Sequence, residues 1–210
     1  EKFTGHLAVL HNSTFGVSGA ASDNEIGTPA SEFISENALV VQNAYVNWMI
    51  SNDLMLKVGR MPVVIGDERV MGENDYQVNP YAFEGFGLGY ESEFAHVGFY
   101  GLKLVDATAA NDDNDNQRNL YIVNVDFKSL PEFLSMANLH IIADNQNAFP
   151  NTPNLDVTAK TESTRYGIAV GGESMGVDYR VTYEAVNGEQ GLGSPKQDLT
   201  QDMMDIELGY

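Results

Sequence analysis

The sequence predicts an all-β fold: a transmembrane antiparallel up-and-down β-barrel with about ten strands, in one domain spanning residues 1–210. Ten short stretches alternate apolar and polar residues with a period of two, which is typical of strands that separate two different environments. The connections between these stretches alternate between long and short, as in outer-membrane barrels. No apolar run approaches the ~18 residues that predict a transmembrane helix.

The alternating stretches follow one another along the whole chain. They cover residues 2–11, 39–50, 54–61, 83–91, 95–104, 119–128, 138–144, 164–172, 177–185 and 203–210. The ninth shows the pattern most clearly, because Val177, Val181 and Tyr183 alternate with Arg180 and Glu184. The fifth has apolar residues on both faces, so the pattern alone does not assign its outer face.

Each predicted strand has one apolar and one polar face. The apolar face, which we expect to contact lipid, includes Ala44, Val46, Trp48, Ile50, Leu54, Leu56, Val58, Phe86, Leu88, Tyr90, Tyr121, Val123, Val125, Phe127, Leu139, Ile141, Ala143, Tyr166, Ile168, Val170, Met204, Ile206, Leu208 and Tyr210. The polar face, which we expect to line a lumen, carries Asn47, Lys57, Asn124, Asp126, His140, Arg165, Arg180, Glu184, Asp205 and Glu207. Candidates for an aromatic girdle at the membrane surface are Trp48, Tyr90, Tyr100, Tyr121, Tyr166 and Tyr210, although ordinary β-propensity explains any single one equally well.

The connections sort into two classes. Residues 51–53, 92–94 and 173–176 are short, whereas 12–38, 62–82, 105–118, 145–163 and 186–202 are long and rich in Gly, Asn, Asp, Ser and Pro. Segment 129–137 occupies a short-turn position but is longer, and it is a candidate for a helical turn. A soluble β-sandwich would show the same strand alternation. The aromatic apolar faces, the rhythm of the connections and the scarcity of Lys on the polar faces favour the barrel.

Composition narrows the classes of partner. The net charge is −19 with only 11 Lys and Arg, which argues against nucleic acid, since phosphate neutralisation needs basic residues. The chain has no cysteine, so it forms no disulfide or thiolate metal site. The run Asn111 to Asn116 could hold Ca²⁺ or bridge lipopolysaccharide through divalent ions, but it lacks the Gly and terminal Glu of an EF-hand loop. A solvated acidic loop is the better interpretation.

Motifs between residues 43 and 90 suggest a family. They are Asn43-Ala44-Tyr45-Val46-Asn47-Trp48, Val58-Gly59-Arg60-Met61, Ile65-Gly66-Asp67-Glu68-Arg69-Val70-Met71-Gly72, Asp75-Tyr76 and Phe83-Glu84-Gly85-Phe86. Over this range the chain resembles the alginate-export porin family of Gram-negative bacteria. That family has a Val-Gly-Arg strand end, then Gly-Asp-Glu-Arg, an apolar pair, Gly and an Asp-aromatic step, before a strand resumes with Phe-Asp-Gly.

The resemblance implies a porin-like channel in the cell outer membrane that passes small hydrophilic solutes by passive diffusion. Its partners would be outer-membrane lipid, lipopolysaccharide and small polar solutes, and a homo-oligomer is compatible with it. Barrels of that family have more strands, so this chain would be either part of a larger barrel or a smaller relative. A polyanion needs a strongly basic lumen, whereas the basic lumen residues here are few and mixed with acids, so we do not carry over alginate as the substrate.

Charges of both signs crowd the connection 62–82 and its flank. We expect the pore or its constriction to be lined by Arg60, Asp67, Glu68, Arg69, Glu73 and Asp75, together with Arg165, Arg180 and Glu184 from the eighth and ninth strands. Opposed charges at low dielectric set a transverse field that selects solutes by charge. The alternative for the first group is a salt-bridge cluster that closes the strand-to-loop junction. The alternative for the second is a set of charges that neutralise one another and fill a narrow lumen.

Catalysis has the least support. The histidines His6, His11, His96 and His140 show no metal-site spacing, and no Gly-x-Ser-x-Gly turn is present. Asp113 and Asp115 match half of the pattern of ten-stranded outer-membrane proteases, but no loop supplies an Asp and a His two residues apart. We therefore predict no enzyme, no cofactor and no metal, and a passive channel with a mild cation preference from its acidic mouth. A non-conducting structural or adhesin barrel is the alternative, and an outer-membrane hydrolase is less favoured.

Overall fold

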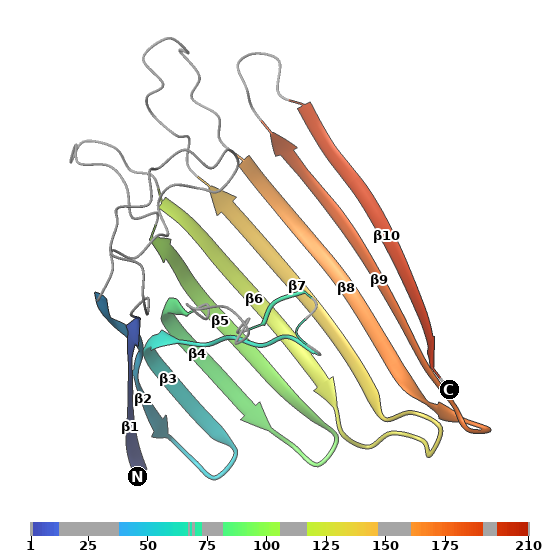
Figure 1. Cartoon of the computed structure of the whole chain (residues 1–210), viewed down its shortest axis with the longest axis horizontal. Coiled ribbons are helices and arrows are strands. Elements are labelled where there is room, and N and C mark those ends of the chain that lie inside the picture. The colour runs from blue at the N-terminus through green and yellow to red at the C-terminus, as the bar shows by residue number, and fades with distance from the viewer. Residues whose placement is uncertain are drawn as a thin grey trace, which may run out of the picture.

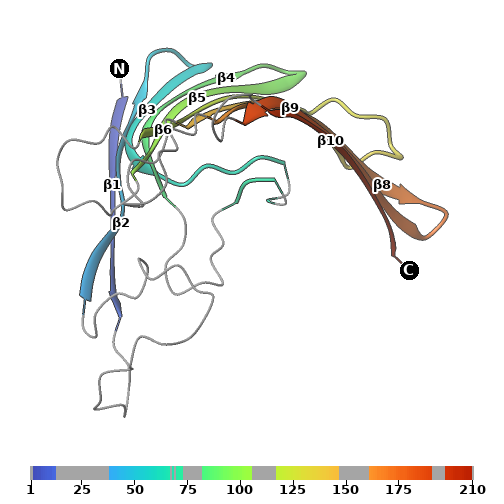
Figure 2. The same ribbon diagram turned by 90° about the horizontal axis from the view of Figure 1, so that it is seen from above.

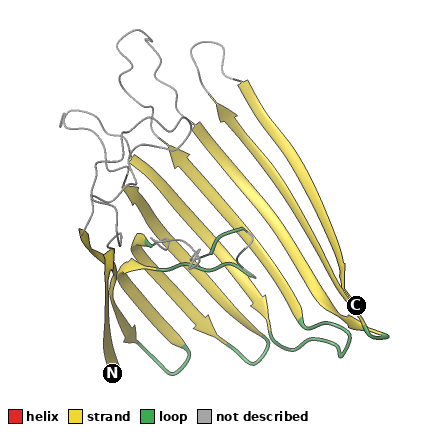
Figure 3. Cartoon of the chain, viewed as in Figure 1, coloured by secondary structure: helices red, strands yellow, loops and turns green. Residues whose placement is uncertain are grey.

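The chain forms one antiparallel sheet of ten strands (Figure 1). The computed structural model describes residues 2–12, 38–66, 68, 70–72, 82–105, 117–146, 161–190 and 197–209, and these contain no helix (Figure 3). The strands are β1 (Lys2–Asn12), β2 (Ala38–Met49), β3 (Leu54–Met61), β4 (Phe83–Glu91), β5 (Ala95–Val105), β6 (Gln117–Phe127), β7 (Met136–Gln146), β8 (Thr161–Ser174), β9 (Val177–Gln190) and β10 (Gln197–Gly209).

Each strand pairs with the next one along the chain, in the order β1 to β10. The predicted antiparallel up-and-down topology is therefore confirmed. The described strands form a curved, open sheet rather than a closed barrel, because β1 and β10 are not paired with each other (Figure 2). The curvature gives the sheet a convex face and a concave face.

All ten predicted strands are present, and the later ones are longer than expected. β8 and β9 have 14 residues each and stay in register from Ser174↔Val177 to Thr161↔Gln190. The residues added to them are mostly polar and lack the alternation on which the prediction relied. The backbone ladder continues through them because its hydrogen bonds do not depend on side-chain polarity.

The short connections lie together at one end of the sheet (Figure 1). The turn between β8 and β9 consists of Met175 and Gly176, both with positive φ (55° and 76°), as a type I′ turn requires. Between β6 and β7 the expected helical turn is replaced by a β-turn, in which Leu134 N–H donates to the Pro131 carbonyl at 2.8 Å.

Exposed apolar side chains cover the convex face. One cross-strand row runs through eight consecutive strands and consists of Leu54, Tyr90, Val97, Val125, Leu139, Ile168, Tyr183 and Met204. The next row contains Phe3, Trp48, Leu56, Leu88, Phe99, Val123, Ile141 and Tyr166. Val123, Ile141 and Ile168 are 39–44% exposed, so no other layer of the described chain covers them.

The described residues of the β3–β4 connection fold onto the concave face (Figure 2). Its residues Val63 and Ile65 are buried together with Met61 at the end of β3. The sheet contributes Phe83, Leu102, Leu120, Ile122 and Ile142 to the same cluster. The main apolar core of the described chain is thus built between this connection and β4–β7, inside the arc of the sheet.

This cluster explains the ambiguous fifth strand. In β5, Val97 and Phe99 are exposed on the convex face, whereas Leu102 is 3% exposed and packs against the connection. Tyr100, a candidate for the outer aromatic girdle, packs against the same cluster and therefore lies on the concave face instead. The concave face of β5 is apolar because it packs in this cluster, whereas the apolar side chains on its convex face are exposed in the described structure.

Candidate functional site

Polar residues are concentrated in the middle of the concave face. The most buried polar side chains of the described chain are Asn124 of β6, Asn138 and His140 of β7, and Thr182 and Glu184 of β9, each at most 5% exposed. Asn124, His140 and Glu184 lie in one row, since each is paired with the next strand in turn and Gly167 of β8 stands between the last two. Such burial is costly unless the polar groups find partners.

Asn138 connects the polar groups of β6 and β7. Its Nδ2 donates to Asn124 Oδ1 and to Asp126 Oδ1, both at 2.6 Å, and Asn124 Nδ2 donates to Asp126 Oδ2 at 2.6 Å. With both amide hydrogens used, Asn138 presents Oδ1 to His140 Nδ1 at 3.0 Å. An amide oxygen only accepts, so this contact places a hydrogen on Nδ1 of the imidazole.

A glycine allows His140 to contact Glu184 across β8. Nε2 of His140 lies 2.9 Å from Oε1 of Glu184, although neither atom makes a hydrogen bond in the described structure, and the two side chains are 1% and 6% exposed. A Cβ at Gly167 would lie 2.1 Å from that nitrogen and 2.4 Å from that oxygen. Even alanine would therefore collide with the pair in its present position.

The β3–β4 connection lies against this polar network. Ile65 N–H donates to the Met71 carbonyl at 2.9 Å, which brings the two sides of the connection together in an isolated antiparallel bridge. Gly66, at the turn of this bridge, has φ of 57°, a left-handed conformation that favours glycine. A Cβ built on Gly66 would lie 3.6 Å from Cγ of Asn138, so the turn is in close contact with the network.

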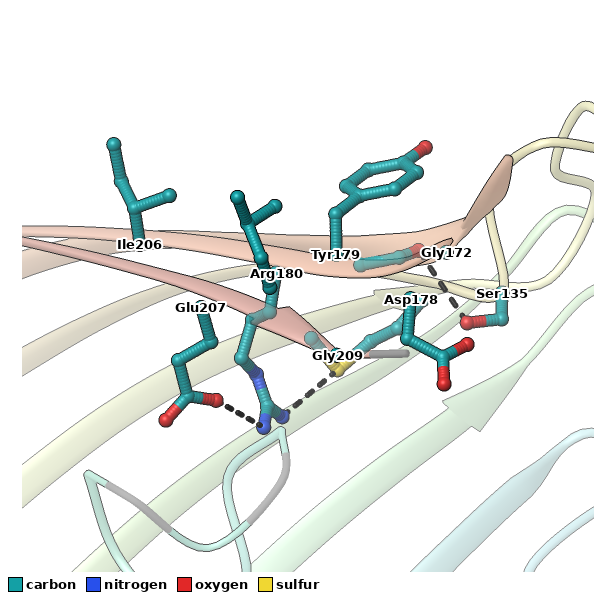
Figure 4. Close-up of a pocket in the computed structure, with 11 residues that line it drawn as sticks. Ser135, Gly172, Asp178, Tyr179, Arg180, Ile206, Glu207 and Gly209 are labelled. Carbon is teal, nitrogen blue, oxygen red and sulfur yellow. Dashed lines mark hydrogen bonds and ion pairs between the residues drawn. The ribbon is translucent and has the colours of Figure 1, made fainter. Parts of the chain in front are cut away.

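A separate charged region lies at the turn end of β8–β10. It borders a pocket of about 730 Å³. Figure 4 shows Arg180 and Glu207 on one side of the strands, with Tyr179 and Ile206 on the other. Arg180 Nη1 lies 3.9 Å from Glu207 Oε2, and Nη2 lies 3.8 Å from Met136 Sδ. The described residues of the connection pack on β4–β7, and none of them lines this pocket.

The residues predicted on the eighth and ninth strands share the concave face. In the register, Arg165 pairs with Ile142, Arg180 with Gly171 and Glu184 with Gly167. Each of these positions alternates along its strand with the convex residues, so all three charged residues lie on the concave face. The three charged residues do not form one neutralising cluster. In the described structure, Glu184 contacts His140 and Arg180 contacts Glu207.

Arg60 departs from the expected lumen position. Arg60 precedes the buried Met61 and is paired with Glu84. Like the exposed Val58 two residues earlier, it occupies a convex position of the strand. Its Nη1 lies 3.4 Å from Glu84 Oε1, and its Nε donates to the Gln42 carbonyl at 3.1 Å. The strand alternation therefore places this ion pair on the convex side, near the end of the sheet away from the short turns. The structure corrects our expectation for Arg60.

The remaining predicted charges belong to the β3–β4 connection. Glu68 is exposed and has φ of 72°. Asp67, Arg69, Glu73 and Asp75 lie outside the described residues, as do Tyr210 and the acidic run 111–116 with Asp113 and Asp115.

Two pairings on the concave face were missed by sequence reasoning. The alternation assigned His140 and Glu184 to one face, but only the register shows that they are two strands apart with a glycine between them. Arg118 donates through Nε to Asp144 Oδ1 at 2.8 Å. Arg118 lies just before the strand predicted at 119–128, so this pair could not be recognised.

Comparisons with known proteins add no assignment. The chain matches no protein-family model, and no characterised protein is significantly similar to it. Among the described residues, no group of three or more His, Asp or Glu side chains is placed to hold a metal ion. The described part of the chain also has no helix long and apolar enough to cross a membrane.

Proposed function

We propose that the chain forms the wall of a porin-like channel in the outer membrane of a Gram-negative bacterium, through which small hydrophilic solutes diffuse passively. The supporting observation is the contrast between the two faces of the sheet. The convex face is apolar and exposed across the strands, whereas buried polar groups and charges lie on the concave face. This distribution suits hydrocarbon outside and water inside.

The apolar convex face is the strongest part of this argument. A soluble monomer rarely exposes a contiguous apolar patch larger than a few hundred Å². The row from Leu54 to Met204 crosses eight strands, and its members Leu139, Ile168 and Tyr183 are 41–43% exposed. Lipid would cover this face, with lipopolysaccharide in contact at the outer surface.

The dimensions of the strands also support a membrane-spanning wall. The strands contain 8 to 14 residues, and about 9–11 tilted residues cross a bilayer core. A sheet in hydrocarbon must have no free edges, because unpaired backbone groups are very unfavourable there. The proposal therefore requires that the edges of β1 and β10 be paired in the membrane, so that the sheet closes into a barrel.

The β3–β4 connection would narrow the channel. Its described residues pack on the concave face of β4–β7, and a pocket remains at the turn end of β8–β10. The net charge of −19 favours a mild preference for cations. Reversal potentials in planar bilayers test this preference, and clear anion selectivity would refute it.

Cysteine labelling tests the membrane-facing surface. The chain has no cysteine, so a single introduced thiol is a unique reporter. In proteoliposomes, Ile141→Cys on the convex face should react slowly with a water-soluble maleimide, whereas Met175→Cys, at a turn residue that is 101% exposed, should react fast. Equal and fast labelling at both positions, with the protein monodisperse in detergent-free buffer, would contradict the proposal.

A non-conducting structural or adhesin barrel is the second candidate, and one observation favours it. The cluster around Val63, Ile65 and Ile122 fills part of the concave side with apolar side chains. Protection of Ile141→Cys by lipid, combined with the absence of single-channel conductance, would identify this alternative. We do not propose a hydrolase, because the His140–Glu184 pair is too buried to meet a dissolved substrate.

A further inference from the structure

We propose that the pocket at the turn end of β8–β10 binds an amino acid with a positively charged side chain, such as lysine. In this site Arg180 binds the carboxylate of the solute, Glu207 binds its α-ammonium group and Asp178 binds the cation of its side chain. The inference names a solute class for the channel proposed above and rests on that function. Binding itself can be measured without conduction.

The register brings three charged side chains together on the concave face. Glu207 of β10 is paired with Arg180 of β9, and Asp178 lies two residues before Arg180 on the same face of its strand. Figure 4 shows the three side chains on the side of the strands opposite Tyr179 and Ile206. The guanidinium therefore has one carboxylate beside it across the strands and another along its own strand.

Two glycines leave space next to these charges. Gly171 of β8 is paired with Arg180, and Gly209 of β10 is paired with Asp178. Neither glycine carries a side chain that would cover the neighbouring charge. The pocket that they line has a volume of about 730 Å³, and small-molecule sites usually have about 300–1,000 Å³. The pocket is therefore large enough for a whole amino acid.

The three charges are accessible to a dissolved solute. The side chains of Arg180 and Glu207 are 22% and 47% exposed, and Asp178 is exposed. The side chains of His140 and Glu184 on the same face of the sheet are only 1% and 6% exposed. A solute that moves along the concave face can therefore reach the pocket at the turn end without a rearrangement of the sheet.

The contacts that Arg180 makes in this pocket are loose. Its Nη1 lies 3.9 Å from Glu207 Oε2, whereas a charge-assisted hydrogen bond measures about 2.7–2.9 Å. Its Nη2 lies 3.8 Å from Met136 Sδ, and a thioether is a weak acceptor. A free carboxylate accepts two parallel N–H bonds from a guanidinium. The carboxylate of an amino acid is therefore a better partner for Arg180 than either of these contacts.

The balance of charge favours an amino acid with an additional cation. The charged residues that line the pocket are one arginine and two acids. An amino acid with an uncharged side chain pairs with Arg180 and one acid, and it leaves the second acid without a new partner. Residues two apart on a strand are separated by about 6.6 Å, which is comparable with the extended four-carbon stem of lysine. One lysine molecule can therefore contact all three side chains.

Binding of L-lysine and three analogues to the wild-type chain tests each contact separately. Saturation-transfer NMR titrations of the protein in detergent micelles measure the dissociation constants. Cadaverine lacks the carboxylate, Nα-acetyllysine lacks the α-ammonium charge, and norleucine lacks the charge of the side chain. We expect each analogue to bind more weakly than lysine by on the order of fivefold, because each loses one partly exposed ion pair.

Variants assign each contact to one residue. Arg180→Gln should remove the difference in affinity between lysine and cadaverine. Glu207→Gln should remove the difference between lysine and Nα-acetyllysine, and Asp178→Asn should remove the difference between lysine and norleucine. Arg60→Gln is the matched control, because Arg60 forms an ion pair with Glu84 on the convex side, and the affinity for lysine should stay unchanged.

The outcomes separate the site from the channel. Absence of lysine binding, or equal affinities of the wild-type chain for lysine and its analogues, would overturn the site, and neither result depends on a variant that must fold. An equal loss of lysine affinity in Arg180→Gln and Arg60→Gln would overturn it as well. If lysine binds with the expected discrimination but the protein does not conduct in planar bilayers, the channel proposal fails and the site stands. If the protein conducts and lysine binds no better than its analogues, the channel proposal stands and the site fails.

Discussion

The two halves of the concave face differ in what covers them. On β4–β7 the β3–β4 connection buries Ile122, Ile142 and Leu102 in an apolar cluster. On β8–β10 the same face carries Arg180 and Glu207 beside an open pocket of about 730 Å³. Strand alternation alone makes both halves inward-facing. The difference comes from the β3–β4 connection, whose described residues cover the β4–β7 half.

An inward position in this sheet is therefore not necessarily a water-facing position. The β4–β7 half contains apolar residues and the buried amides of Asn124 and Asn138. The β8–β10 half contains the buried side chains of Thr182 and Glu184 and, at its turn end, partly exposed charges. We therefore expect substitutions among the buried residues of this face to change stability, and substitutions of the partly exposed charges at the turn end of β8–β10 to change selectivity.

The largest effect should come from removing apolar volume in the covered half. Ile142 is 6% exposed in the cluster, and its neighbour Ile141 is 44% exposed on the convex face. We expect Ile142→Ala to lower the free energy of unfolding by about 2–5 kcal/mol because it leaves a cavity. Ile141→Ala should cost less. Equilibrium unfolding in urea with the protein in detergent micelles measures both, and equal losses would remove the distinction between the two faces.

A methyl group at position 167 should have the next largest effect. Gly167→Ala places a Cβ against His140 and Glu184, and we expect a loss of about 1–3 kcal/mol from overpacking. Gly5→Ala is the matched control in a strand, because a Cβ there meets no atom within 4 Å. The same unfolding measurement applies. If both variants were equally stable, the contact across β8 would be unimportant.

Removal of the amide at the centre of the polar network should have a comparable effect. Asn138→Ala leaves Asp126 and Asn124 with fewer partners, and we expect a loss of about 1–3 kcal/mol. Asn187 of β9, an exposed residue, provides the control Asn187→Ala. Hydrogen exchange of the β6 and β7 amides should increase only in the Asn138 variant. Unchanged protection there would show that the network does not stabilise the covered half.

The smallest effect on stability should come from the exposed ion pairs. Arg180→Gln and Arg60→Gln should each change the free energy of unfolding by only about 0–1 kcal/mol, since both pairs are partly exposed. Their effects on selectivity should differ. Arg180→Gln should shift the reversal potential toward cations because Arg180 lies on the concave face, whereas Arg60→Gln should not. An equal shift in both variants would contradict the assigned faces.

Much of the sheet could be predicted because a period of two is a local property. Val123, Ile141 and Ile168 were correctly placed on one exposed face, and all ten strands are present. The prediction was least accurate where polarity is uniform. The ends of β8 and β9 are polar on both faces, and β5 is apolar on both, so alternation was uninformative in each.

The candidate site was only partly predictable. The face of Arg180, Asn124 and Glu184 could be assigned from alternation. The face of Arg60 could not be assigned in this way. Arg60 lies next to a charge-rich connection, whose composition suggested a cluster of charges within the lumen. The contact of His140 with Glu184 depends on the pairing of three strands, which no local pattern reports.

The strands, the alternation of apolar and polar residues along them and the apolar character of one face could all be predicted from the sequence. These properties depend on residues that are close together in the chain. The folded chain alone reveals that described residues of the β3–β4 connection cover the β4–β7 half of the concave face, and that Gly167 leaves room for His140 to reach Glu184. The physical reason is that both depend on register and close packing between distant segments, where a shift of one residue would reverse every face.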